Sequence, residues 1–193
     1  MKKIAILDYG LGNVRSLLNS IKKINHNVYF YSQNKKADFD MIFIPGVGSY
    51  GKAMQLLENE KYIQIINNAK NSGKLIIGIC LGMQLLFEHG TESGLSKGLN
   101  YIKGSVNVLD SSQKTKLPNI GSKKIYKSNI DKFSFLNKFN NQKFYFIHAY
   151  ACFPEKKDNI LFYSSYDNKK FAAMVFENNV VGIWDKQCNI DED

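Results

Sequence analysis

Residues Lys74–Phe87 read KLIIGICLGMQLLF, an apolar run followed by the pattern Gly-x-Cys-x-Gly and then by helical spacing. The run Lys74–Ile79 is nearly all apolar, as central strands of a parallel sheet are. Gly78 and Gly82 relieve the crowding of a sharp turn from strand to helix, so the sulfur of Cys80 is expected to be exposed at the carboxyl end of the sheet. This pattern is the thiol form of the nucleophile elbow.

A helix that begins at Leu81 supports a thiolate at Cys80. Its positive end points at the sulfur and lowers the pKa of the thiol, and its first backbone N–H groups are free to donate to an oxyanion. The alternative is a buried, inert cysteine at the end of a strand, which leaves both flanking glycines unexplained. We therefore interpret Cys80 as a nucleophile.

A second glycine cluster, Ile44–Ser49, reads IPGVGS and also follows a predicted strand. In a parallel sheet it lies at the same edge as Cys80, where its backbone can offer N–H donors to a substrate carbonyl. Alone, Gly-x-Gly after a strand also fits a plain tight turn. Together with the cysteine elbow, it favours acyl transfer.

The first half of the chain alternates short apolar runs with helical patterns. Strands are predicted at Lys3–Tyr9, Val28–Tyr31, Met41–Ile44 and Lys74–Ile79, and helices at Gly12–Ile24 and Tyr50–Asn71. Alternation of strand and helix implies a parallel sheet with helices on both faces. The first half therefore predicts an α/β fold.

The second half contains strand patterns with turns between them. The predicted strands are Tyr101–Leu109, Lys143–Tyr150, Ile160–Ser165, Phe171–Phe176 and Val180–Trp184, with a polar loop and short strand at Lys114–Asp131. Asn178-Asn179 is a two-residue hairpin signal between the last two. This half is expected to add antiparallel strands to one end of a mostly parallel sheet. No repeat or linker divides the chain, so residues 1–193 are predicted to form one domain.

Composition excludes several classes of protein. Hydrophobic residues make up 44% of the chain, enough for a folded core, so the chain as a whole is not disordered. There are 26 basic and 17 acidic residues, a net charge of +9, but Arg15 is the only arginine. Nucleic-acid sites favour arginine and clustered charge, and these lysines are spread along the sequence. We therefore expect solvated lysines and no nucleic-acid partner.

The chain has no apolar run of the roughly 20 residues that a membrane span needs. The N-terminal residues Met1–Asp8 reach an acidic residue too early for a signal peptide. A cytoplasmic protein without a membrane partner is expected. Cys80, Cys152 and Cys188 are odd in number and lack Cys-x-x-Cys spacing, which argues against a disulfide framework or a zinc site. We expect no metal and no cofactor.

Four segments in order carry a resemblance over nearly the whole chain. They are Asp8–Asn13 (DYGLGN), Pro45–Gly48 (PGVG), Gly78–Phe87 (GICLGMQLLF) and Tyr145–His148 (YFIH). In this combination the chain resembles the class I glutamine amidotransferase subunit of imidazole glycerol phosphate synthases.

The resemblance implies a reaction, a partner and a set of site residues. The subunit hydrolyses glutamine and passes ammonia to a (β/α)8-barrel synthase subunit, in a heterodimer that acts in histidine biosynthesis. Cys80 is then the nucleophile that forms a glutamyl thioester. The residues implied in binding the substrate glutamine or its oxyanion are Gly46, Val47, Gly48, Leu81, Gly82 and Gln84.

The end of the chain departs from this family. A thiol nucleophile needs a base and acid near neutral pH, for which histidine is suited. The family carries its histidine and glutamate in a near-terminal Gln-Phe-His-Pro-Glu segment, whereas Gly182–Asn189 reads GIWDKQCN. Lys186 occupies the histidine position and Cys188 the glutamate position. Two accounts stay open: a paralogue under weakened constraint, or a shifted reading frame or truncated gene after Gly182.

Two further segments differ from the family. Leu117–Ser122 stands where the family has Pro-His-x-Gly-Trp, and His148–Ala151 where it has His-Ser-Tyr-Tyr. In the family these segments face the synthase and the ammonia route. We therefore expect the partner contacts to have diverged together with the catalytic base.

The three histidines are weak substitutes for the missing base. His26 precedes a strand and is expected at the surface. His89 is expected near the far end of the helix after Cys80, pointing away from the sulfur. His148 is the best candidate, because it ends a strand and can face the site or the partner. Lys186 can act only if burial strongly lowers its pKa.

Three other functions remain as alternatives. A paralogue can feed an amidotransferase that builds sugars of surface polysaccharides. A catalytically inert subunit can retain partner binding, which the missing histidine and glutamate favour. A peptidase-like thiol enzyme of the α/β class is disfavoured by the continuation Leu81–Gln84, which is typical of glutaminases.

Overall fold

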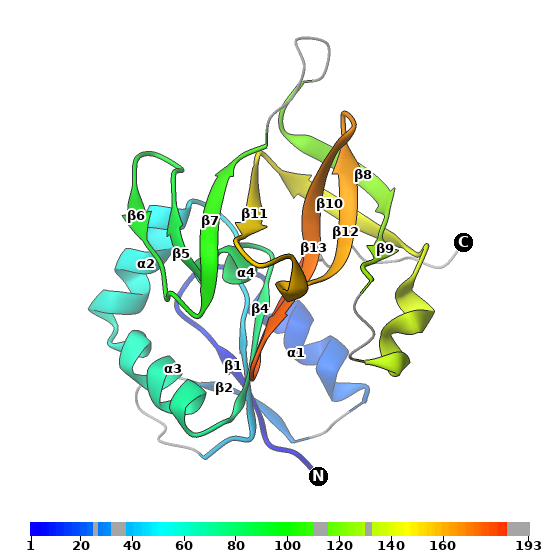
Figure 1. Ribbon diagram of the computed structural model, residues 1–193. Coiled ribbons are helices and arrows are strands. Elements are labelled where there is room, and N and C mark those ends of the chain that lie inside the picture. Colours follow the sequence, from blue (N-terminus) through cyan, green and yellow to red (C-terminus); the bar gives the residue numbers. More distant parts are fainter. Residues whose placement is uncertain (25–26, 32–37, 110–115, 130–132, 185–193) are drawn as a thin grey trace.

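The structure is a computed structural model that describes residues 1–24, 27–31, 38–109, 116–129 and 133–184 (Figure 1). The first half contains β1 (Ile4–Leu7), α1 (Val14–Lys22), β2 (Val28–Tyr31), β3 (Met41–Ile44), α2 (Tyr50–Asn59), α3 (Tyr62–Asn71), β4 (Leu75–Ile79) and α4 (Leu81–Leu85). The second half contains β5 (Phe87–Gly90), β6 (Ser96–Lys97), β7 (Ile102–Val108), β8 (Asn119–Lys124), β9 (Tyr126–Lys127), η1 (Ser134–Phe139), β10 (Lys143–His148), β11 (Tyr150–Pro154), η2 (Lys157–Asn159), β12 (Ile160–Tyr166), β13 (Lys169–Glu177) and β14 (Val180–Ile183).

The largest sheet has eight strands in the order β2-β1-β3-β4-β14-β13-β12-β9. Strands β2, β1, β3, β4 and β14 are parallel, and β13, β12 and β9 continue the sheet in antiparallel pairs. The α/β fold with antiparallel strands added from the second half is therefore confirmed. Two smaller sheets, β11-β7-β5-β6 and β10-β8, accompany it.

Helices pack on both faces of the parallel part because successive strand residues point to opposite faces. On one face, Ile4 and Ile6 of β1 pack with Leu17 and Ile21 of α1. The other face belongs to the main core, which contains Leu57 of α2 and Ile66 of α3. Among the described residues no helix is both long and apolar enough to cross a membrane.

The hairpin predicted at Asn178-Asn179 joins β13 to β14 and fixes β14 beside β4. Asn178 has φ 55°, as the turn requires. The side-chain amide of Asn179 donates to the carbonyls of Lys70 (3.0 Å) and Lys74 (2.7 Å). The hairpin is thereby attached to the segment that enters β4, and β14 lies parallel to β4.

Two helix predictions are wrong. The pattern at Tyr50–Asn71 forms two helices, α2 and α3, because Lys61 has φ 55° and interrupts the α-helical conformation. The helix after Cys80 ends at Leu85, well before His89. The carbonyl of Leu85 instead accepts from the N–H of Leu99, the carbonyl of Leu86 accepts from those of Tyr101 and Ile102, and β5 pairs with β7. His89 therefore lies on a strand.

One strand prediction is also wrong. The segment Lys143–Tyr150 is divided between two sheets. Lys143–His148 is β10, which pairs with β8, whereas Tyr150 begins β11, which pairs with β7. The chain changes sheets at Ala149, whose carbonyl accepts from the N–H of Leu109 at 2.7 Å. The segment predicted as a polar loop and short strand at Lys114–Asp131 contains β8 and β9 within its described part. These changes place His148 and Tyr150 on either side of one bend.

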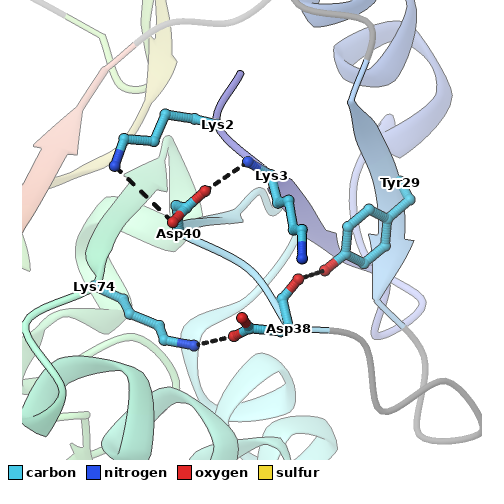
Figure 2. Close-up of polar contacts among 6 residues, drawn as sticks. All are labelled: Lys2, Lys3, Tyr29, Asp38, Asp40 and Lys74. Carbon is cyan, nitrogen blue, oxygen red and sulfur yellow. Dashed lines mark hydrogen bonds and ion pairs between the residues drawn. The ribbon is translucent and has the colours of Figure 1, made fainter.

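Polar contacts join the amino ends of the parallel strands, at the edge opposite Cys80 (Figure 2). Asp40 accepts from the backbone N–H of Lys3 at 2.8 Å and lies 3.9 Å from Lys2 Nζ. Lys74 Nζ lies 2.7 Å from the Asp38 carboxylate, and this hydrogen bond lowers the pKa of Asp38. The Tyr29 hydroxyl donates to the carbonyl of Asp38 at 3.0 Å. These contacts therefore lie at the amino edge of the sheet, whereas Cys80 follows the carboxyl end of β4.

Candidate active site

Cys80 occupies the sharp turn between β4 and α4 that its sequence pattern predicts. Its backbone has φ 55° and ψ −114°, outside the ordinary helical and strand regions. The N–H of Cys80 donates to the carbonyl of Ile183 at 2.9 Å, and the carbonyl of Cys80 accepts from Met83 N at 3.0 Å. Hydrogen bonds to β14 and to α4 therefore hold the unusual backbone conformation.

The glycines on either side of Cys80 are required by close backbone approach. A Cβ atom on Gly78 would lie 2.5 Å from the carbonyl oxygen of Gly82. A Cβ atom on Gly82 would overlap the carbonyl oxygen of Ile44 at the end of β3. The elbow consequently packs directly against the strand that leads into the second glycine cluster.

The second glycine cluster lies beside the elbow. A Cβ atom on Gly46 would lie 3.1 Å from Leu81 Cβ and 2.5 Å from the Tyr9 hydroxyl oxygen. That hydroxyl donates to the carbonyl of Pro45 at 2.7 Å. Burial, and next the charge of Cys80, raise the pKa of Tyr9, so Tyr9 remains a donor at neutral pH. Tyr9 thus holds the cluster against the start of α4.

A cleft of about 320 Å³ opens above the elbow. It is lined by Val47, Gly48, Cys80, Leu81, Gln84, Glu92, Pro118, Ile147, His148, Ala149, Tyr150 and Trp184. The structure therefore brings together five of the seven site residues named from the sequence. The other two, Gly46 and Gly82, do not line the cleft but form the close backbone contacts beneath it.

Gln84 and Glu92 supply polar groups to this cleft. Gln84 is buried, and its side-chain amide donates to the carbonyl of Tyr150 at 3.3 Å. The carboxylate of Glu92 accepts from the N–H of Tyr50, the first residue of α2, at 2.7 Å. Sequence reasoning missed Glu92, because it lies in a turn without a motif, 12 residues after Cys80. It is the one acidic side chain among the described residues that line the cleft.

His148 lines the cleft, but its imidazole is engaged on both sides. Nδ1 donates to the carbonyl of Tyr150 at 2.9 Å, and Nε2 accepts from the side-chain amide of Asn119 at 2.9 Å. Burial lowers the pKa of His148 to about 4, although the bond to Tyr150 opposes that shift. The ring is consequently neutral at physiological pH, and its only lone pair on nitrogen already accepts a hydrogen bond. This arrangement does not offer a base to Cys80.

Neither His89 nor Cys152 lines the cleft. His89 is on β5. Cys152 is buried in the core, where burial raises the pKa of its thiol. The predictions for His26, Lys186 and Cys188 fall outside the described residues. Within the ranges that the structure describes, no three His, Cys, Asp or Glu side chains are grouped as metal ligands.

Comparison with known proteins identifies the family of the chain. The family described as "Glutamine amidotransferase class-I" matches residues 5–183. The fold resembles "Crystal structure of glutamine amidotransferase", with a TM-score of 0.70 at 12% identity over 93% of this chain and 87% of that one. It also resembles "Structure of PurLQS from Thermotoga maritima", with a TM-score of 0.68 at 21% identity over 95% and 86%. The chain belongs to the class I glutamine amidotransferases.

Proteins with similar sequences show to which group within this class the chain belongs. "Imidazole glycerol phosphate synthase subunit HisH" of Sulfurimonas denitrificans is 36% identical over 93% of this chain and 87% of its own length. The HisH proteins of Prochlorococcus marinus strain SARG and Sulfolobus acidocaldarius are each 35% identical, over 92% and 93% of this chain and 83% and 87% of their own lengths. Within the class, these HisH subunits are the family to which the chain belongs.

Proposed function

We propose that this chain hydrolyses glutamine to glutamate and ammonia, as the glutaminase subunit of an imidazole glycerol phosphate synthase in histidine biosynthesis. The observation that carries the proposal is Cys80 in its strained turn, beside Val47 and Gly48 in one cleft. A thiol at a strand-to-helix elbow, next to a loop that can supply backbone N–H donors, is suited to acyl transfer.

The reaction follows from that arrangement. The thiolate of Cys80 attacks the carboxamide carbon of glutamine and forms a tetrahedral oxyanion. The N–H groups of Gly48 and Leu81 are our candidates for its donors, because both residues line the cleft beside Cys80. Leu81 is the first residue of α4, and the first N–H groups of a helix have no partner within it. The C–N bond then breaks, the nitrogen takes up a proton and leaves as ammonia, and a thioester remains on Cys80. Water hydrolyses the thioester to glutamate and restores the thiol.

The other end of the substrate needs partners for an ammonium and a carboxylate. Glu92 is suited to the α-ammonium group, because it supplies a carboxylate to the wall of the cleft. Gln84 places its amide in the same cleft and has a hydrogen bond to Tyr150 that holds it there. These two side chains favour a free amino acid as the substrate.

The proton of the Cys80 thiol requires an acceptor other than His148. Both ring nitrogens of His148 already have hydrogen-bond partners. We propose that the acceptor is Lys186, which stands at the family's histidine position, or a group of the partner subunit. Activity that appears only in the complex would favour the partner subunit.

The proposed partner is a (β/α)8-barrel synthase subunit that receives the ammonia and uses it in a lyase reaction, in a cytoplasmic heterodimer. The mouth of the cleft supports a protein partner. Val47 and Ile147 line the cleft, yet 47% and 36% of their surfaces are exposed. Apolar residues around a site opening are suited to burial against another subunit.

The test is glutamate release from glutamine by the chain alone and with the synthase subunit of the same organism. We expect release that rises with the partner and is lost in Cys80→Ala. Cys152→Ala is the matched control, because Cys152 is buried in the core and does not line the cleft, and it should keep the activity. A folded chain that binds the synthase but releases no glutamate would instead favour the inert binding subunit. Release that a sugar amidotransferase stimulates, and the synthase does not, would favour the polysaccharide paralogue.

A further inference from the structure

A second cavity, of about 560 Å³, shares no lining residue with the cleft above Cys80. Its walls come from the end of β11, from η2, from the segment after β9, and from neighbouring parts of β12 and β13 (Figure 1). Sites for small molecules commonly have volumes of about 300 to 1,000 Å³. The cavity therefore has the size of a binding site, and the chemistry proposed at Cys80 does not use it.

Aromatic side chains line part of this second cavity. Phe153 of β11 lines it and leaves 37% of its surface exposed. Tyr163 of β12 also lines it, and the Tyr163 ring lies 5.8 Å from that of Tyr126, its partner across β9 and β12. A planar ring that packs on these side chains would remove their apolar surface from water. The cavity thus favours a ligand that contains such a ring.

Two lysines bring positive charge to the same cavity. Lys170 Nζ lies 4.4 Å from the centroid of the Tyr163 ring, a cation–π contact that holds the ammonium group beside the aromatic side chain. Lys157 of η2 lines the cavity as well. Neither lysine has an ion-pair partner within the part of the chain that the structure describes. An anion in the cavity would therefore meet two ammonium groups that are not paired with a carboxylate.

The lining also contains polar groups that accept or donate hydrogen bonds. Ser128 and Asn129, which follow β9, contribute a hydroxyl and an amide. Asp158 contributes a carboxylate, and an ionised carboxylate only accepts hydrogen bonds. Asp158 therefore favours a ligand that has hydroxyl or amino groups in addition to its negative charge. Together the lining offers places for a planar ring, for an anion and for hydrogen-bond donors.

We propose that the second cavity binds a nucleotide, the class of small molecule that combines a planar base, sugar hydroxyl groups and a phosphate. The base packs against Phe153 and Tyr163. The phosphate accepts from Lys157 and Lys170, since charge-assisted hydrogen bonds to phosphate are strong. Asp158 accepts from the sugar hydroxyls or from an amino group of the base. This inference goes beyond the proposed function and does not rest on it, because nucleotide binding can be measured without glutamine.

A mononucleotide fits better than a strand of nucleic acid. The aromatic, cationic and polar groups line one cavity. Surfaces that bind a strand instead follow its backbone along a groove, and they favour arginine. No arginine lines the cavity, and Arg15, the one arginine of the chain, lies on α1.

The experiment measures the binding of AMP to the unaltered chain by isothermal titration calorimetry. We expect a dissociation constant below about 1 mM. Adenosine and inorganic phosphate each lack one part of the ligand, so each should bind at least about tenfold more weakly than AMP. No detectable binding of AMP, or phosphate binding as tight as that of AMP, would overturn the inference. Tighter binding of a short single-stranded oligoadenylate would overturn it as well, in favour of a nucleic-acid surface.

Two double variants test the role of the lysines. Lys157→Met/Lys170→Met should weaken AMP binding about tenfold or more, because it removes both charged donors from the cavity. The matched control is Lys156→Met/Lys169→Met, which makes the same change in net charge at the residue before each lysine, outside the lining of the cavity. The control should bind AMP within about twofold of the unaltered chain, since salt screens exposed charges. An equal loss in both double variants would show that general charge attracts AMP, against the inference.

A further variant tests the aromatic side chains. Tyr163→Leu should weaken the binding of AMP but leave that of inorganic phosphate unchanged, because it removes the surface for the base and keeps both lysines. Circular dichroism of each variant checks that it is folded. Unchanged AMP binding by a folded Tyr163→Leu would contradict the proposed position of the base. Glutamate release is measured separately, so failure of AMP to bind leaves the proposed function standing, and an inactive chain that binds AMP leaves this inference standing.

Discussion

The imidazole of His148 stacks on the indole of Trp184, with ring centroids 4.4 Å apart and an interplanar angle of 26°. Phe171 contacts the same imidazole at 4.9 Å. These rings exclude water from His148, which is the main reason that its pKa falls to about 4. His148, at the wall of the cleft, is therefore a neutral structural residue with a fixed tautomer.

The stability of the protein should consequently depend on pH between 6.5 and 4. An unfolded chain takes up a proton on His148 near pH 6.5, whereas the folded protein resists protonation until about pH 4. The stabilisation is therefore complete above pH 6.5 and is lost as pH falls to 4, by up to about 3 kcal/mol. Urea unfolding at pH 7 and pH 4.5 measures it. His148→Gln should lose less free energy of unfolding over this interval, and an unchanged loss would contradict the assignment.

His148→Gln should also retain glutamine hydrolysis. Loss of a general base typically lowers kcat about 10²- to 10⁴-fold. His148 is not expected to be that base, because both of its ring nitrogens already have hydrogen-bond partners. We expect kcat of the complex to stay within about tenfold of the unaltered protein. Steady-state kinetics at pH 7.5 provide the measurement. A drop in kcat of three orders of magnitude, with KM and folding unchanged, would restore His148 as the base.

The α/β fold and the elbow could be predicted from local sequence. The apolar run before Cys80 and its two flanking glycines have a direct structural cause, which is the close contact of Gly78, Gly82 and the carbonyl of Ile44. The Asn178-Asn179 turn likewise needs only two residues to define it. Both segments have a short pattern of residue types that can be recognised in the sequence, although the contact of Gly82 with Ile44 joins segments that are distant in the chain.

Other features depend on contacts between distant segments. The helical spacing after Cys80 continues past Leu85, but the carbonyls of Leu85 and Leu86 accept hydrogen bonds from Leu99, Tyr101 and Ile102. Glu92 reaches the cleft because its carboxylate accepts from the N–H at the start of α2. The pairing of Lys124 with Lys143 comes from strand register. Neither the composition of the chain nor the periodicity of its apolar residues predicts these contacts between distant segments.

Gly82→Ala should destabilise the protein strongly. The added methyl group would overlap the carbonyl oxygen of Ile44, which belongs to the central sheet and cannot retreat without breaking its pairing. We expect a loss of about 3 kcal/mol or more in the free energy of unfolding, together with loss of glutaminase activity. Gly51→Ala is the matched control, since Gly51 lies in α2 and its added Cβ meets only Ser96 Oγ at 3.2 Å.

The control should change the free energy of unfolding by no more than about 1 kcal/mol, because alanine has the better helix propensity. Chemical denaturation of the two variants side by side gives the comparison. If Gly82→Ala unfolds at the same denaturant concentration as the unaltered protein, the close approach of the elbow to β3 is not rigid, and the requirement for glycine has another cause.

Glu92→Gln should separate substrate binding from chemistry. The glutamine side chain retains an oxygen that can accept from the N–H of Tyr50, so α2 keeps its first hydrogen bond, but the negative charge offered to the α-ammonium group of the substrate is gone. We expect KM for glutamine to rise about 10- to 100-fold, with kcat within a few-fold and an unchanged melting temperature.

Glu88→Gln is the control, because Glu88 lies on β5 facing Lys103 and does not line the cleft. An equal rise of KM in both variants would show that general charge, rather than a contact from Glu92, attracts the substrate. A fall in kcat with KM unchanged would place Glu92 in the chemistry instead of in binding.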